Sequence, residues 1–269
     1  MSDKNPNQND VVVAASPDSG GQALPRVGAP RRRRERQVWD WRLSRTPGRT
    51  WDPQVLAVSL VVLGAGVFGG GIANRFLGTA GPVVSSWVLW VSMAVVVALA
   101  FVSARPRGLL KIRSIDLLWG VALGTALRLV QGWLSGADHN AFPSPATLDG
   151  QLGADWWLQQ ALPAVVVAPL LEEFVFRGVI LVAVFQILRR GLGPAAAGAT
   201  ALLVSAAAFV LLHGMAGVVT LVDGIQLFAI GAVCALVVLL SGRIWGAVLV
   251  HLVYNLTYLA LALTGFVLS

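Results

Sequence analysis

The hydrophobic and polar positions divide the chain into two unequal parts. Residues 1 to 50 are rich in Gly, Pro, Ser, Asn and Arg and show no sustained apolar periodicity, which is the composition of a disordered tail. After residue 50, long apolar runs alternate with short polar links. Because roughly 20 apolar residues are needed for one helix to cross a bilayer, the pattern predicts an all-α, polytopic transmembrane bundle at 51–269 behind a disordered basic tail at 1–50.

Seven apolar runs are long enough to be spans. The fourth run is interrupted by Pro163 and Pro169, so an eighth span is expected if 156–171 and 172–188 are separate elements. The count therefore stays open between seven and eight. The predicted spans cover residues 55–73, 83–104, 115–134, 156–188, 195–213, 221–240 and 244–268.

Composition supports lipid as the main solvent of the bundle. The chain is 56% hydrophobic and only 12% charged, against about 25% charged residues in soluble domains. The net charge of +7 does not indicate nucleic-acid binding, because ten of the twenty Lys and Arg residues lie in the first fifty positions. The basic run of the tail has two interpretations, a site for anionic lipid headgroups or a solvated segment that fixes topology. Its arginines are Arg31, Arg32, Arg33, Arg34 and Arg36.

Every second predicted loop is basic, and Arg75 is the exception. By the positive-inside rule this places the N-terminus in the cytoplasm and the C-terminus outside. If the source is bacterial, the membrane is the plasma membrane. Trp39, Trp41 and Trp51 precede the first span, and tryptophan is enriched at the membrane–water interface, so we expect these three side chains there.

A few charged and amide side chains interrupt the apolar spans. Such residues are rare in spans because hydrocarbon does not solvate them, and they usually mark function. For Arg128 the sequence shows no partner, so we expect it to snorkel to the interface or to pair with an acid elsewhere. The others are in the last hundred residues: Glu172, Glu173, Arg177, His213, His251 and Asn255.

The two glutamates follow Pro169, which is tolerated at a helix start. Both would then lie in a first helical turn, where carboxylates are favoured. Glu173 and Arg177 are four residues apart, the spacing and order of a helical ion pair. Glu172 points about 100° away from Glu173. The spacing predicts that Arg177 neutralises Glu173 and leaves Glu172 free to act as a general base for water.

Two further polar groups lie on other spans. His213 ends an apolar helix, and His251 and Asn255 are one turn apart on another, facing the same way. A histidine and an asparagine directed at a developing oxyanion would stabilise a tetrahedral intermediate. Each group alone is commonly structural, but three such groups on three spans favour an active site.

The motifs resemble those of a known family. Glu-Glu-x-x-x-Arg at 172–177, Phe-x-x-x-His at 209–213 and His-x-x-x-Asn at 251–255 are similar to the signatures of CPBP intramembrane metalloproteases. This family includes type II CAAX prenyl endopeptidases and bacteriocin-processing, Abi-type proteins. The resemblance implies a protease-like core at about 156–268. It implies that Glu172 and His213 activate water and that His251 and Asn255 hold the oxyanion. Supporting roles fall to Glu173, Arg177 and Phe209.

Metal dependence stays open from the sequence. Glu172, His213 and His251 would supply the two nitrogens and one carboxylate of a Zn²⁺ site. A metal-free mechanism with Glu172 as direct base fits the same residues, and we prefer it. The substrate would be a prenylated or other membrane-associated protein or peptide. The alternatives are a non-catalytic adaptor or immunity protein on the same fold, and a proton-coupled transporter.

The depths of the predicted site residues conflict. On straight helices, His251 is about 12 Å from the inner end of its span, whereas His213 and Glu172 are about 27 Å from the ends of theirs. Helix tilt, a short sixth span, an extension of the fourth-span helix or a re-entrant loop at 214–226 would each reduce the difference.

Overall fold

The computed structural model describes residues 40–43, 51–145, 151–217 and 219–268, and these contain helices and no strands. The all-α prediction is confirmed. Residues 1–39 and 44–50, for which disorder was predicted, lie outside the described residues. They include Trp39 and the arginines of the basic run. The helices are α1 (Pro53–Phe76), α2 (Gly81–Ser103), α3 (Ser114–Leu134), α4 (Ala154–Trp156), α5 (Ala168–Glu173), α6 (Leu181–Ala216), α7 (Leu221–Ser241) and α8 (Trp245–Leu268), with a 3₁₀ turn η1 (Gly78–Ala80) and π-helical segments η2 (Trp157–Ala161), η3 (Pro163–Val167) and η4 (Phe174–Ile180).

Local sequence signals fix where several helices begin. The side chain of Asp52 accepts a hydrogen bond from the Val55 N–H and caps α1, whose first turn contains Pro53. Thr220 and Asp223 form a reciprocal capping box at the start of α7. Such caps satisfy the free N–H groups of a first turn. The long helices consequently begin and end within a few residues of the predicted spans.

The fourth span forms one uninterrupted helical path from α4 through η2, η3, α5 and η4 into α6. The linking residues have right-handed helical torsions. Pro163 and Pro169 lie within this path. Proline removes an N–H donor and clashes with the preceding turn, and the neighbouring π-helical turns widen the backbone locally. The chain therefore passes Pro169 without a break, and the structure does not support an eighth span.

Among the described residues, six helices are long and apolar enough to cross a membrane, fewer than the predicted seven or eight. One of the six is the 62-residue stretch Ala154–Met215, about 90 Å of helix, three times the thickness of a hydrocarbon core. Its backbone breaks at Gly193, where φ is 76° and ψ is 167°. This conformation favours glycine. Beyond the break the chain folds back on itself. The hydrogen bond from the Ser205 hydroxyl to the Phe176 carbonyl, at 3.0 Å, shows that the two parts lie side by side.

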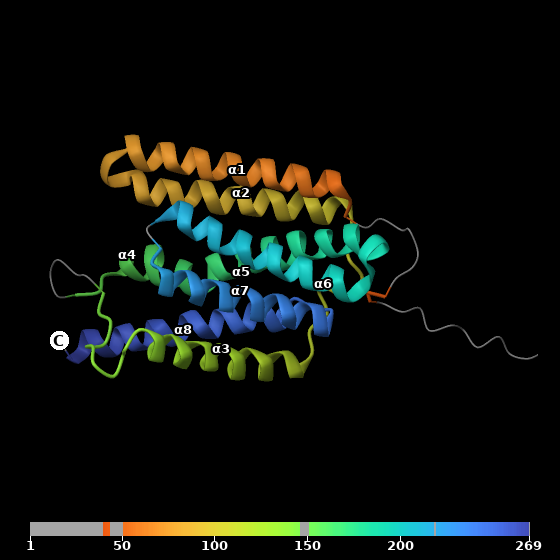
Figure 1. Cartoon of the computed structure of the whole chain (residues 1–269). Helices are drawn as coiled ribbons and strands as arrows, with labels where there is room; N and C mark the ends of the chain where they lie inside the picture. Colours follow the sequence, from red (N-terminus) through yellow and green to blue (C-terminus); the bar gives the residue numbers. More distant parts are fainter. Residues whose placement is uncertain (1–39, 44–50, 146–150, 218, 269) are drawn as a thin grey trace, which may run out of the picture. The chain divides into compact units, whose positions relative to one another are not determined.

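Figure 1 shows how the helices are arranged within residues 38–269. α1 and α2 form a hairpin at one side, α3 and α8 lie together at the opposite side, and α5, α6 and α7 lie between these pairs. The middle helices carry much of the fully buried apolar set, including Leu181, Phe209 and Val238. The motifs at 172–177 and 209–213 therefore lie on the middle helices, and the motif at 251–255 lies on the neighbouring helix α8.

Trp41 and Trp51, predicted at the membrane interface, are buried among other side chains of the protein. Trp41 is 3% exposed, its indole N–H donates to the Gly242 carbonyl, and its ring packs edge-on against Phe185. Trp51 is 2% exposed and donates to the Ala100 carbonyl at 2.7 Å. Each indole N–H donates to a backbone carbonyl inside the protein, so neither needs the interface for its polar N–H. Trp41, assigned to the tail, packs with the bundle.

Candidate active site

The paired glutamates lie at the end of α5, in the middle of the fourth span. Glu172 and Glu173 are its last two residues, and Arg177 follows one turn later in η4. Because the helix continues backward through Pro169, the glutamates are not in a first turn, contrary to prediction. Their N–H groups are within the helix, so a helix N-terminus does not stabilise the carboxylates here.

Glu173 and Arg177 form a fully buried ion pair. The Arg177 Nη1 is 2.9 Å from the Glu173 Oε1, and both side chains are completely inaccessible. The pairing predicted from the spacing is therefore present. The contact lacks hydrogen-bond geometry, and within the described part of the chain Glu173 Oε2 and the three guanidinium nitrogens of Arg177 have no hydrogen-bond partner. The guanidinium instead lies 4.6 Å from the centre of the Phe209 ring, where the ring quadrupole attracts a cation.

His251 connects the two glutamates. Its Nδ1 is 3.0 Å from the Glu173 Oε1 and its Nε2 is 3.8 Å from the Glu172 Oε2. A carboxylate accepts only, so Nδ1 carries the hydrogen of the short contact. The longer contact is an ion-pair distance, not a hydrogen bond. Glu172 remains 13% exposed, and in the described residues its carboxylate accepts no hydrogen bond.

His213 is near this cluster but separated from the glutamates by Phe209. Its Nδ1 lies 2.9 Å from the Phe209 carbonyl, which accepts only, so Nδ1 is the donor and Nε2 is free. The Phe209 ring centre is 4.5 Å from that of His213 and 5.6 Å from that of His251. Both histidine rings therefore pack against one buried phenyl ring, His213 tilted and His251 edge-on, and the structure shows no direct contact of His213 with Glu172.

Asn255 faces a backbone carbonyl. It lies one turn beyond His251 on α8, as predicted, and its amide donates to the Ala164 carbonyl of η3 at 2.8 Å. No pattern in the sequence indicates this partner. One N–H of the amide is used by Ala164, and the second N–H is the donor that a reacting group would use.

The conflict in depth is removed by an extension of the fourth-span helix. The Ile244 Cδ1 lies 3.3 Å from where a Cβ of Gly178 would be, so the start of α8 lies opposite Gly178. His251 is then about 10 Å past that level and Glu173 about 8 Å past it in the same direction. Beyond Gly178 the helix continues for about 20 Å to the break at Gly193. The region 214–226 is not re-entrant, because α6 reaches Ala216 and α7 begins at Leu221.

The three proposed zinc ligands do not form a metal-binding set. Across the described ranges, no three His, Cys, Asp or Glu side chains are placed to hold a metal ion together. Glu172 and His251 are 3.8 Å apart, but His213 contacts the Phe209 ring and shows no contact with Glu172. The arrangement of Glu172, His213 and His251 therefore does not fit a Zn²⁺ site.

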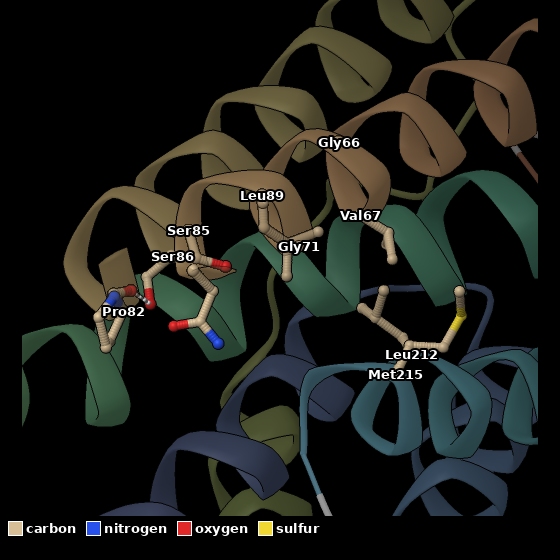
Figure 2. Close-up of a pocket in the computed structure, with 11 residues that line it drawn as sticks. Gly66, Val67, Gly71, Pro82, Ser85, Ser86, Leu89, Leu212 and Met215 are labelled. Carbon is tan, nitrogen blue, oxygen red and sulfur yellow. Dashed lines mark hydrogen bonds between the residues drawn. The ribbon is translucent and has the colours of Figure 1, made fainter. Parts of the chain in front are cut away.

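A cavity of about 230 Å³ lies between α1, α2 and the end of α6. Leu212 and Met215, which flank His213 in the sequence, form its α6 wall (Figure 2). The remaining wall mixes glycines with the polar side chains of Asn74, Ser85 and Ser86, and Ser86 donates to the Pro82 carbonyl. The sequence did not indicate this cavity, because it is formed by residues from three separate helices.

Comparison with known proteins gives one family match. The family model described as type II CAAX prenyl endopeptidase, Rce1-like, matches residues 154–257. The searches of curated proteins and of solved structures gave no match. The matched segment contains all three motifs and extends from α4 into α8. With six helices able to span a membrane, the match supports an integral, multi-pass membrane protein. Residues 154–257 are thus similar to the Rce1-like type II CAAX prenyl endopeptidases, and this match supports the family resemblance that the motifs indicated.

Proposed function

We propose that this protein is an intramembrane endopeptidase that hydrolyses a peptide bond in a prenylated or otherwise membrane-associated protein. The observation that carries the proposal is the division between the two glutamates. Glu173 is held by Arg177 and His251, whereas Glu172 is partly exposed beside His251 and accepts no hydrogen bond from the described residues. A carboxylate free of partners beside a histidine is suited to take a proton from water.

The proposed reaction uses only side chains of this chain. Glu172, assisted by the free Nε2 of His213, removes a proton from water, and the resulting hydroxide adds to the carbonyl carbon of the scissile bond. The carbonyl oxygen becomes an oxyanion, which accepts hydrogen bonds from the second N–H of the Asn255 amide and from the Nε2 of His251 in its imidazolium form, which carries a hydrogen on both ring nitrogens. Collapse breaks the C–N bond, and the proton held by Glu172 passes to the leaving amine.

The supporting residues act through those that react. Arg177 balances the charge of Glu173, and Glu173 orients His251 through its Nδ1. Phe209 separates the histidines and covers the Arg177 guanidinium. A buried, oriented group of this kind loses no free energy to reorganisation when charge develops.

Further parts of the proposal concern the membrane. The N-terminus would be cytoplasmic, with Arg31, Arg32, Arg33, Arg34 and Arg36 binding anionic lipid headgroups, each contributing about 1 kcal/mol near the surface. In a bacterial source the location would be the plasma membrane. Binding to vesicles with and without anionic lipid, compared for the full chain and for a variant with these arginines replaced by glutamine, tests the lipid contact.

The decisive experiment is cleavage of membrane-bound peptides by the reconstituted protein. Glu172→Gln should lower kcat by about 10²- to 10⁴-fold, the usual contribution of a general base. Prenylated and unmodified versions of one peptide would identify the substrate class. A chelator should leave the activity unchanged if Glu172 acts without a metal.

The matched control is Asp138→Asn, which removes an exposed carboxylate and should leave kcat unchanged. Undiminished cleavage by Glu172→Gln would contradict the role of this residue. A wild-type protein that cleaves nothing, together with intact cellular function of Glu172→Gln, would favour the adaptor. A transporter would instead need polar side chains along a path through several spans, and Glu172, Glu173, Arg177, His213, His251 and Asn255 are confined to the elements α5, η4, α6 and α8.

A further inference from the structure

Arg128 lies in α3, outside the family match, and its contacts differ from both expectations. It is 8% exposed, so it does not snorkel to the interface. Within the described residues Arg128 does not pair with an acid either, because its acceptors are neutral oxygens. Nη2 donates to the Tyr254 carbonyl at 2.6 Å, Nε donates to the same oxygen at 3.2 Å, and Nη1 donates to the Gln131 side chain. The guanidinium carbon is 3.7 Å from the centre of the Tyr254 ring.

The bonds from Nε and Nη2 reach the backbone of α8 at Tyr254, the residue before Asn255. A backbone carbonyl moves only with its helix, so Arg128 restrains the helix and not just one side chain. Thr257 strengthens the same point, because its hydroxyl donates to the Tyr254 carbonyl at 2.8 Å and lies 3.4 Å from the Arg128 Nε. Both groups converge on one oxygen, in an apolar interior where each hydrogen bond is electrostatically strong.

Arg128 is the last of four residues by which one face of α3 contacts α8 and the turn before it. Asp116, fully buried, pairs with Arg243 at 2.7 Å at one end. Gly120 and Gly124 follow at intervals of four, and a Cβ at Gly124 would lie 2.7 Å from the Val250 carbonyl. Residues four apart share one helix face. The stripe therefore fixes α8 over about 18 Å.

The opposite side of the contacted turns carries the proposed oxyanion donors. His251 meets Glu173 at 3.0 Å and Asn255 meets Ala164 at 2.8 Å. Both contacts depend on the rotation and the axial position of α8. A misplacement of about 1 Å can lower the rate of a positioned reaction by about 100-fold.

We infer that Arg128 is a positioning residue, which holds α8 at the Tyr254 carbonyl so that His251 and Asn255 face the glutamates and the substrate carbonyl. The inference rests on the proposed function for its catalytic consequence. Its structural part, the restraint on α8, stands independently of any activity and is measured independently.

The activity test compares Arg128→Met with Arg128→Lys in the reconstituted protein. Arg128→Met should lower kcat by about 10- to 100-fold and change KM by less than about threefold, because Arg128 does not contact the proposed reacting groups. Lysine keeps the charge and a donor, and should restore part of kcat. Because Arg128 would act through Asn255 as well as His251, the loss of kcat in Arg128→Met combined with Asn255→Ala should be smaller than the product of the two single losses. Losses that multiply in the double variant would overturn the inference.

The structural test needs no activity. Spin labels at Leu158 in η2 and Leu256 in α8, both exposed, report the distance between the two elements that Asn255 and Ala164 join. Arg128→Met should broaden or shift that distance, whereas Arg75→Met, at an exposed arginine ending α1, should not. An unchanged distance in Arg128→Met overturns the restraint. A changed distance in a protein that cleaves nothing would keep the restraint and reject the proposed function.

Discussion

Arg128 and Arg177 are both buried arginines inside an apolar bundle, and the protein accommodates them in opposite ways. Arg177 faces a carboxylate at 2.9 Å, while its guanidinium nitrogens have no well-formed hydrogen bond among the described residues. Arg128 contacts no acid in the same part of the chain, yet each of its guanidinium nitrogens donates to a neutral oxygen. Arg177 therefore has a counter-charge but few hydrogen bonds, whereas Arg128 has hydrogen bonds on every guanidinium nitrogen but no counter-charge among the described residues.

The difference separates two uses of a buried charge. A cation whose donors all reach carbonyl and amide oxygens is fixed in place and serves well as an anchor. A cation that faces a carboxylate but is poorly hydrogen-bonded has its charge balanced and leaves N–H donors without partners. The second arrangement is the one beside Glu172 and His251. Where buried polar groups are left short of partners, function is a common reason.

Arg177→Met is the substitution expected to have the largest effect. It would leave Glu173 buried without its counter-charge, and breaking a buried pair in this way costs about 3–5 kcal/mol. The free energy of unfolding in detergent, measured by denaturant titration, should fall by that amount. Replacing both partners by methionine should recover part of the loss, because no unpaired charge then remains.

The matched control for Arg177→Met is Arg75→Met at an exposed position, which should change stability by less than about 0.5 kcal/mol. A loss in Arg177→Met no larger than this would show that Glu173 is not charged in the folded protein. The contrast with Arg128 would then disappear, because neither arginine would be balancing a buried anion.

Gly124→Leu tests the Arg128 side of the comparison and should have a moderate effect. The new side chain would press against the Val250 carbonyl, since even a Cβ would lie 2.7 Å from it. Overpacking of this kind costs about 1–3 kcal/mol, measurable by the same titration. Gly132 is on the same helix, and a Cβ there would be at an ordinary 3.7 Å from the nearest atom. Gly132→Ala should therefore be neutral or slightly stabilising.

Contacts that are local in the sequence were predictable, and contacts between distant residues were not. The spans follow from hydrophobic run length, and the Glu173–Arg177 pair follows from a spacing of four. The bond from Arg128 to Tyr254 joins residues 126 positions apart. Its acceptor is a backbone carbonyl, and every residue has one, so the sequence contains no sign of it. The partner of Asn255 at Ala164 escaped prediction for the same reason.

The backbone at the two critical prolines shows a second limit. Pro169 was expected to begin a helix, but π-helical turns carry the chain through it. Gly193, directly before Pro194, breaks α6 instead. Proline excludes a hydrogen bond in either case, and tertiary packing decides whether the helix bends, widens or reverses. The relative depth of His251 and Glu172 depends on where this helix continues and where it breaks.

Arg42 is a third arginine that combines both arrangements near the surface, and its expected effect is the smallest. Its Nη1 donates to the Leu239 and Leu240 carbonyls at the end of α7, and its Nη2 is 2.6 Å from the Asp40 Oδ2. Burial raises the pKa of Asp40, but the hydrogen bonds and charge of Arg42 outweigh burial, so this pKa is lowered from its usual value of 3.8. The lowered pKa in the folded state means that the Asp40 carboxylate stabilises the fold at pH above about 4.

That contribution should be lost as the pH falls below about 4 towards the pKa of Asp40 in the folded protein, because protonation removes the ion pair. The unfolding midpoint of the wild type should therefore exceed that of Asp40→Asn at pH 6, and the gap should narrow as the pH is lowered. Asp138→Asn, at an exposed acid, should show no such gap. A gap for Asp40→Asn that stays constant down to pH 3 would mean that Arg42 is held by the two carbonyls alone. Arg42 would then stabilise the fold in the manner of Arg128, with no contribution from a paired carboxylate.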